Sequence, residues 1–166
     1  IDHLSKIAFD FSQFANISST KVELFNLHDI IGSLKELYQR EEVQITWQPI
    51  EGKAMLKADR TQMNRLFTNL LQNAVEATNG SRKVKIDITE KRENGKLMIS
   101  VQDNGEGIPE YMQSKIFVPN FTTKSSGTGL GLAMCKGIVE QAKGEIWFET
   151  KQGEGTIFFI ELPLAN

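Results

Sequence analysis

The segment Asp103-Asn104-Gly105-Glu106-Gly107-Ile108-Pro109 gives the first indication of how this sequence folds. It follows Leu97, Ile99 and Val101, which alternate with polar residues and predict a strand with one buried face. We therefore expect the Asp103 carboxylate at the end of a sheet, where a ligand can lie, and the glycines allow close approach of the backbone. Asp, Asn and Gly are also ordinary turn residues, so a solvated turn is the alternative interpretation.

Strands and helices surround this segment without regular alternation. Val84, Ile86 and Ile88 form another alternating run, and Asn94-Gly95 between the two runs predicts a hairpin. Further strands are expected at 43–48, 54–57, 145–150 and 156–162. Helical spacing of apolar residues predicts helices at 26–39, 59–78 and 129–142, with a weaker helical pattern at 110–116. This order predicts an α+β fold, a two-layer α/β sandwich with helices on one face of a mixed, mostly antiparallel sheet.

A second glycine-rich segment, Ser126-Gly127-Thr128-Gly129-Leu130-Gly131-Leu132, opens the last predicted helix. Amides exposed at a helix start beside glycines favour a site for anionic phosphates, and a merely flexible segment is the alternative. The Rossmann pattern is excluded because a polar run, not a buried strand, precedes these glycines. The Walker pattern is excluded because Gly52-Lys53 and Gly95-Lys96 lack the Ser or Thr that it requires.

The overall composition excludes other classes of protein. A formal net charge of −2 and a pI near 5.8 argue against nucleic acid as a partner. The single cysteine, Cys135, cannot form an internal disulfide, and no stretch reaches the ~20 apolar residues of a membrane span, so a reducing cytoplasmic context is expected. The chain begins at Ile1 without a signal-peptide pattern, and we expect a piece of a larger protein whose membrane anchoring is left open.

Read in order, these motifs resemble the boxes of sensor histidine kinases. As a whole, the sequence resembles the nitrogen-regulation type of these kinases. The resemblance runs from about Leu24 to the C-terminus. The asparagine box matches Asn69-Leu70-Leu71-Gln72-Asn73-Ala74, and the first glycine box matches Asp103-x-Gly105-x-Gly107. The phenylalanine box matches Ile116-Phe117-Val118-Pro119-Asn120-Phe121-Thr122-Thr123-Lys124, and the second glycine box matches Gly127-Thr128-Gly129-Leu130-Gly131-Leu132. The closing hairpin matches Gly153-x-Gly155-Thr156. The family implies the Bergerat fold, which gyrases, mismatch-repair ATPases and heat-shock chaperones share.

The resemblance implies the ATP-binding catalytic domain of a two-component sensor histidine kinase, an ATP-dependent phosphotransferase of signal transduction. Its cofactors would be ATP and Mg²⁺, and the γ-phosphoryl would pass to a histidine on a dimerisation domain absent from this sequence. The expected partners are that phosphoacceptor domain, a response regulator and, in the full-length protein, a second copy of the chain. Residues 21–166 would form the catalytic domain. Residues 1–20 would be a linker and the end of the second dimerisation helix, with an apolar stripe that includes Leu4, Ile7 and Phe11.

The resemblance also assigns roles to single residues. In the family, the residue matching Asp103 bonds the adenine amino group, and a carboxylate can only accept. The residue matching Asn73 holds Mg²⁺ through a hard carbonyl oxygen. Lys124, in the lid between Phe117 and Gly127, could reach a phosphate, although a solvated lysine is the alternative. No catalytic residue is expected in this fragment, and Asn73 is the expected metal ligand. The expected nucleotide-binding residues are Asn69, Asn73, Asp103, Gly105, Gly107, Ile108, Phe117, Thr123, Lys124, Gly127, Thr128, Gly129, Leu130, Gly131 and Leu132.

Asn69 bears on the choice between kinase and hydrolase. Hydrolysing relatives carry a Glu as general base four residues before the metal-binding Asn, and an amide cannot take up that proton at neutral pH. Phosphoryl transfer is thus favoured over ATP hydrolysis, while a nucleotide-sensing module and a serine kinase of the anti-sigma type stay as alternatives. Glu76 and Asn120 depart from the family pattern, in which Lys and a second aromatic residue are common.

Three other reactive side chains have no expected part in the chemistry. His28-Asp29 copies only the first two letters of the phosphoacceptor motif, and His3 fits no better. We interpret His28 as an ordinary residue at a helix start. Cys135 lies in an apolar helical run and is expected to be an inert core thiol.

Overall fold

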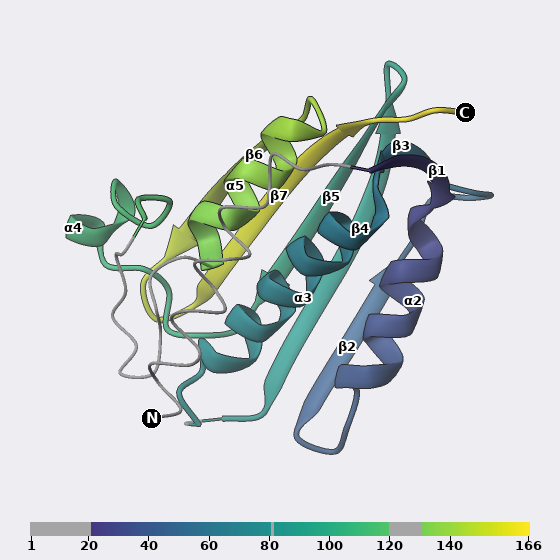
Figure 1. Ribbon diagram of the computed structural model, residues 1–166. Helices are drawn as coiled ribbons and strands as arrows, with labels where there is room; N and C mark the ends of the chain where they lie inside the picture. Colours follow the sequence, from purple (N-terminus) through teal and green to yellow (C-terminus); the bar gives the residue numbers. More distant parts are fainter. Residues whose placement is uncertain (1–20, 81, 120–130) are drawn as a thin grey trace, which may run out of the picture.

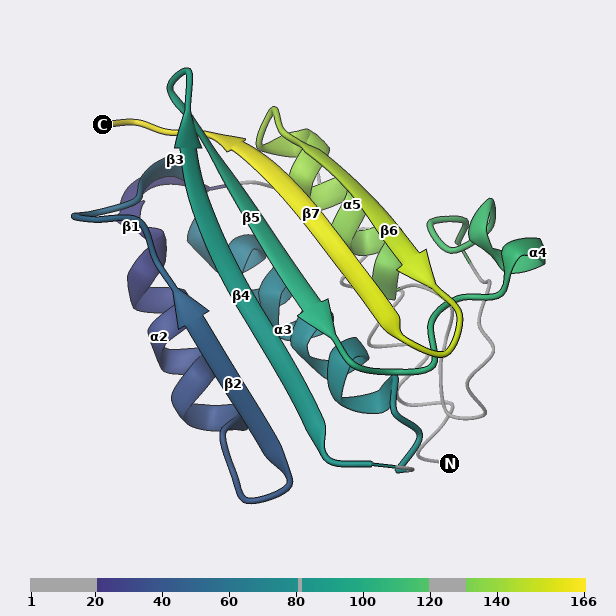
Figure 2. The ribbon, with the colours of Figure 1, turned by 180° about the vertical axis from the view of Figure 1, so that it is seen from behind.

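The computed structural model describes residues 21–80, 82–119 and 131–166. A five-stranded sheet has the order β2-β4-β5-β7-β6, in which β2 is parallel to β4 and the other pairs are antiparallel. Helices α2, α3 and α5 cover one face of the sheet, whereas the face turned toward the viewer in Figure 2 carries none of the described helices (Figures 1 and 2). The predicted two-layer sandwich is confirmed. The elements are β1 (Val22–Asn26), α2 (Leu27–Tyr38), β2 (Val43–Gln48), β3 (Met55–Asp59), α3 (Arg60–Glu76), β4 (Val84–Glu93), β5 (Lys96–Asp103), α4 (Glu110–Gln113), α5 (Gly131–Gln141), β6 (Glu145–Lys151) and β7 (Gly155–Pro163).

Helix α3 forms the centre of the helical layer. Its N-cap is Asp59, whose side chain accepts a hydrogen bond from the Gln62 amide at 3.1 Å and satisfies one of the open amides of the first turn. Residues at spacings of three and four are buried against the sheet, as the sequence predicts. Each large apolar side chain contributes ~1.5–3 kcal/mol by this burial. The buried residues of α3 are Gln62, Met63, Leu66, Phe67, Leu70, Leu71 and Ala74.

The β4–β5 hairpin fixes where β5 ends. Asn94 and Gly95 have φ values of 54° and 76°, the left-handed backbone that a type I′ turn requires. The register that follows from this turn pairs Asp103 with Ile86 and makes Asp103 the last residue of β5. The predicted hairpin therefore carries the carboxylate to the end of the sheet, as expected.

Strand β1 was not among the elements expected from the sequence. Val22 and Leu24 are 56% and 62% exposed, so the strand lacks the alternation that reveals a buried face. It pairs with β3 in a separate two-stranded sheet. Asn26 joins this sheet to α2, because its Oδ1 accepts from the amides of His28 and Ala54, both at 3.1 Å. Asn26 is thus the N-cap of α2.

Two further expectations concern the N-terminal segment and a membrane-spanning helix. The segment assigned to a dimerisation helix and linker, residues 1–20, lies outside the described residues. Within the parts of the chain that the structure describes, no helix has the length and apolar character needed to cross a membrane.

Candidate functional site

Asp103 is a buried carboxylate with one oxygen held by the backbone. It is 6% exposed, and its Oδ1 accepts from the amides of Gly105 at 2.9 Å and Thr156 at 3.2 Å. In the described part of the chain, none of the hydrogen bonds to this side chain reaches Oδ2. Burial raises the pKa of Asp103 above its ordinary value, and the amides of Gly105 and Thr156 oppose that rise. The carboxylate is thus fixed in place and keeps an acceptor for a further donor.

The glycines of the loop after β5 allow close contact with protein backbone. A Cβ at Gly105 would lie 2.4 Å from the Cβ of Ala77, at the end of α3. Gly107 has a φ of +79°, and a Cβ there would lie 2.6 Å from the Lys151 carbonyl oxygen. Both neighbours belong to the protein, so these glycines pack the loop between α3 and the β6–β7 hairpin. The Gly105 amide also donates to Asp103 Oδ1, so the packing of Gly105 helps to fix the carboxylate.

Asn69 and Asn73 lie half-buried on α3, and the start of α5 lies beside the first of them. The Asn69 side chain donates from Nδ2 to the Arg65 carbonyl oxygen at 2.9 Å. A Cβ at Gly131, the first residue of α5, would lie 3.1 Å from Asn69 Oδ1. The structure therefore brings together the polar flank of α3 and the first turn of α5, two features that the sequence places about 60 residues apart.

Ile108 and Phe117, two members of the expected nucleotide set, both have contacts within the protein. Both pack against the apolar core, and Ile108 donates its amide to Thr150 Oγ1 at 2.9 Å. The Phe117 ring lies 6.0 Å from that of Phe148, and the Lys136 Nζ lies 5.8 Å from its centroid. Phe117 is thus part of an aromatic cluster beside α5.

Several residues of the expected nucleotide set lie outside the described residues. Of the others, Leu132 is half-buried against the core on α5. The expected site residues for which the structure gives no placement are Thr123, Lys124, Gly127, Thr128, Gly129 and Leu130.

Thr150 had no expected role, although it contacts the loop that holds Asp103. Its Oγ1 lies 2.9 Å from Thr156 Oγ1 and donates to the Gly155 carbonyl oxygen at 3.1 Å. A signal was present in the sequence, because Thr150 continues the core-facing alternation of Phe148 with a hydroxyl in place of an apolar side chain.

His28 and Cys135, which the sequence analysis singled out, have contacts within the fold, and His3 lies outside the described residues. The His28 ring, near the start of α2, contacts Glu90 at 2.6 Å. Cys135 is fully buried, and burial raises the pKa of its thiol to about 12, so the reactive thiolate is suppressed.

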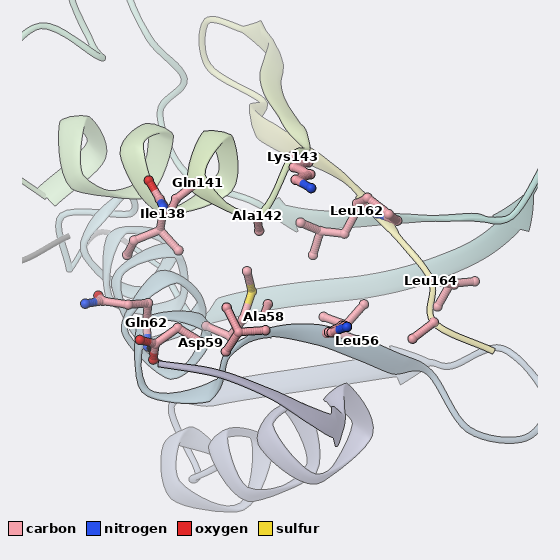
Figure 3. A pocket seen from close by; sticks show the side chains of 15 residues that line it. Leu56, Ala58, Asp59, Gln62, Ile138, Gln141, Ala142, Lys143, Leu162 and Leu164 are labelled. Atoms are coloured by element: carbon pink, nitrogen blue, oxygen red, sulfur yellow. Dashed lines mark hydrogen bonds between the residues drawn. The ribbon is translucent and has the colours of Figure 1, made fainter. Parts of the chain in front are cut away.

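A separate apolar groove of about 660 Å³ lies at the other end of α3 (Figure 3). Leu56, Ala58, Ile138 and Leu162 line it, and Gln62 stands at its side. Eleven residues separate Gln62 from Asn73, a rise of ~16 Å along the helix. The groove is therefore not part of the Asp103 site.

Metal binding at this site would depend on the ligand that shares it. The described residues contain no group of three or more His, Cys, Asp or Glu that could hold a metal ion by themselves. Mg²⁺ commonly takes one or two protein oxygens and completes its shell with water and substrate phosphates. A half-buried amide such as Asn73 fits that kind of partial donor set.

Comparison with known proteins gives one consistent family. Residues 58–166 match the family described as "Histidine kinase-, DNA gyrase B-, and HSP90-like ATPase". Sensor histidine kinase ZraS of Salmonella typhimurium is 30% identical over 167 residues, which cover 98% of this chain and 36% of ZraS. This chain thus spans little more than a third of that relative.

Solved structures agree with the fold. The nucleotide-free catalytic domain of histidine kinase ThkA has a TM-score of 0.77 and 34% identity, over 87% of this chain and 97% of its own. ThkA in complex with response regulator protein TrrA has a TM-score of 0.79 and 30% identity, over 99% of this chain and 49% of the ThkA chain. The fold expected from the resemblance is confirmed. The chain belongs to the histidine kinase-, DNA gyrase B- and HSP90-like ATPase family.

Proposed function

We propose that this chain is the ATP-binding catalytic domain of a two-component sensor histidine kinase. In this proposal it binds MgATP and presents the γ-phosphoryl group to a histidine on a dimerisation domain of the same protein. The observation that carries the proposal is the buried Asp103 carboxylate, which has Oδ1 held by two backbone amides and Oδ2 without a bond from the described residues.

The chemistry of Asp103 favours adenine as the base. An ionised carboxylate is an acceptor, and the exocyclic amino group of adenine is a donor. Guanine has a carbonyl oxygen at the equivalent position, so acceptor would face acceptor. A buried charged group left unpaired costs ~1–3 kcal/mol, which corresponds to a preference for ATP of roughly fivefold to 150-fold.

The end of the site toward α5 suits the phosphates. Amides at the start of a helix carry partial positive charge, and Gly131 opens α5 beside Asn69. Asn73 would hold Mg²⁺, which when bound supplies charge neutralisation to the phosphates. Asn69 already donates to Arg65 and has no basic atom, so it cannot activate water. Transfer to another nucleophile is therefore favoured over hydrolysis.

The partners follow from the family and stay proposals for the whole protein. ThkA has been solved in complex with the response regulator TrrA. By that likeness, we infer a response regulator as the downstream partner and a homodimer formed through dimerisation helices. We assign residues 21–166 to the catalytic domain, in the cytoplasm, where ATP is available.

Nucleotide titration of single-residue variants tests the proposal. Wild type should bind MgATP more tightly than MgGTP, and Asp103→Ala should remove that preference. Asn73→Ala should remove the dependence of ATP binding on Mg²⁺. Asn64→Ala is the matched control, because Asn64 is exposed on the same helix and its Oδ1 accepts from the Thr68 hydroxyl.

Isothermal titration gives both affinities for each variant, with and without Mg²⁺. Equal affinity for ATP and GTP on wild type, or an unchanged ratio in Asp103→Ala, would reduce Asp103 to a turn residue. An Asn73→Ala variant that keeps its full Mg²⁺ dependence would remove Asn73 from the site.

A further inference from the structure

Asp103, Thr156 and Thr150 form a polar row on the helix-facing side of the sheet. The ends of β5, β6 and the start of β7 lie together at one end of the sheet (Figure 2). The Thr156 amide donates to Asp103 Oδ1 at 3.2 Å, and Thr156 is the register partner of Thr150. Alternation along the strands puts the row on the same side as buried Val101 and Phe158.

Among the residues that the structure describes, the Thr150 hydroxyl has three partners, and we name this group the Thr150 cluster. The Ile108 amide donates to Thr150 Oγ1 at 2.9 Å, and Oγ1 donates to the Gly155 carbonyl oxygen at 3.1 Å. The third partner is Thr156 Oγ1 at 2.9 Å. The cluster ties the loop after β5 to the β6–β7 hairpin.

A proton count fixes the direction of the contact between the two hydroxyls. A hydroxyl has one donor and two acceptor positions. Thr150 uses its proton on Gly155 and one acceptor position on Ile108. All three contacts are satisfied together only if Thr156 donates its proton to Thr150. Thr156 then offers acceptor lone pairs, and no proton, to any other group.

We propose that Thr150 is a positioning residue that sets the base specificity of the nucleotide site. Because its cluster takes the Thr156 proton, the row presents two acceptors, the Thr156 hydroxyl and the Asp103 carboxylate. Such a row favours a purine edge that carries an amino group over one that carries a carbonyl oxygen. The inference rests on the proposed function, since it requires a nucleotide base at Asp103.

Substitution of Thr150 by an isosteric residue without a hydroxyl tests the inference. In Thr150→Val, the Thr156 proton is released and can be donated to a carbonyl oxygen. The probes are MgATP and inosine triphosphate, whose base has a carbonyl oxygen in place of the 6-amino group. The preference for ATP should fall by about threefold to tenfold, the range expected for loss of one net hydrogen bond. Thr150→Ser, which restores a hydroxyl, should recover the wild-type ratio.

The control is Thr89→Val, which removes a threonine hydroxyl that contacts Ser100 on the opposite face of the sheet and should leave the ratio unchanged. A Thr150→Val variant in which both nucleotides weaken equally would show a merely structural role and overturn the inference. If Thr150→Val does not fold, Thr156→Val carries the test, because Thr150 keeps its bonds to Ile108 and Gly155. An unchanged ratio in a folded Thr156→Val would overturn the inference. A wild type with no preference for ATP would instead refute the proposed function.

Discussion

Two buried carboxylates of this domain differ in how much of their hydrogen-bonding capacity the protein uses. Glu90 on β4 has a fully buried side chain, and both of its oxygens have partners. Its Oε1 contacts His28 Nε2 at 2.6 Å and accepts from the Ile50 amide at 3.1 Å, while Oε2 accepts from Trp47 Nε1 at 2.8 Å. Asp103 has both of its described hydrogen bonds on Oδ1.

In the proposed function, this difference separates a structural carboxylate, Glu90, from a binding carboxylate, Asp103. Glu90 joins α2, β2 and β4, and its acceptors are occupied by groups that are fixed in the fold. Asp103 is held by the backbone through Oδ1, and among the described residues none donates to Oδ2, the oxygen that we propose accepts from the base. Burial of a carboxylate costs free energy unless the group is paired. The full pairing of Glu90 offsets this cost, whereas the pairing of Asp103 offsets less of it.

The largest effect is expected from Glu90→Ala. The substitution leaves the Trp47 indole N–H, the Ile50 amide and His28 without their acceptor. Removal of one member of such a buried network costs ~3–5 kcal/mol. The midpoint of urea unfolding should fall accordingly, while nucleotide affinity per folded molecule stays near the wild-type value.

Glu93→Ala is the matched control for Glu90→Ala. Glu93 lies on the same strand, pairs with Lys91 at 3.4 Å, and has a side chain that is 60% exposed. Surface pairs of this kind contribute ~0–1 kcal/mol. If the two variants unfold at the same urea concentration, the Glu90 network does not stabilise the fold.

An intermediate effect is expected from Asp103→Asn, on binding and not on folding. The amide can keep its oxygen toward Gly105 and Thr156, but its N–H₂ group then faces the adenine amino group, donor against donor. ATP affinity should fall by about tenfold to a hundredfold, and the free energy of unfolding at neutral pH should be equal or higher. Titration calorimetry and urea unfolding measure the two quantities.

The stability of the domain should depend on pH through Asp103. Burial raises its pKa in the native state, so the native state binds the proton more tightly than the unfolded state. The contribution of Asp103 to stability is therefore most favourable below its ordinary pKa and declines as pH rises through the raised pKa. The difference in stability between wild type and Asp103→Asn should shift in that direction as pH rises above about 4, the ordinary pKa of an aspartate. A difference that does not change with pH would contradict the raised pKa.

The two carboxylates were not equally predictable from the sequence. Asp103 could be placed at a sheet end because the run before it alternates and the Asn94-Gly95 turn fixes the register. Glu90 continues the core-facing series of Val84, Ile86 and Ile88, so its position was visible, but its partners were not. His28 and Trp47 come from distant segments, and contacts between them depend on packing that no local pattern encodes.

The loop after β5 shows a similar division. Its glycines were expected to allow close approach of the backbone, and they do. The sequence could not tell what approaches, and the structure gives Ala77 and Lys151 as the neighbours of Gly105 and Gly107. Strand β1 was missed because Val22 is exposed and no buried alternation marks it.

The smallest effect is expected from Gly32→Ala, beside the Glu90 network. Gly32 lies inside α2, where glycine is less favourable than alanine by ~0.5–1 kcal/mol. A Cβ there would meet the Trp47 ring at 3.7 Å, an ordinary van der Waals contact. The urea midpoint should therefore rise slightly, and the ATP-to-GTP affinity ratio should stay as in wild type. At Gly105 the same methyl group would overlap Ala77, so the region that holds Glu90 tolerates an added atom where the region that holds Asp103 does not. A lower midpoint in Gly32→Ala would mean that the added methyl displaces Trp47 from Glu90, and the two regions would then be equally constrained.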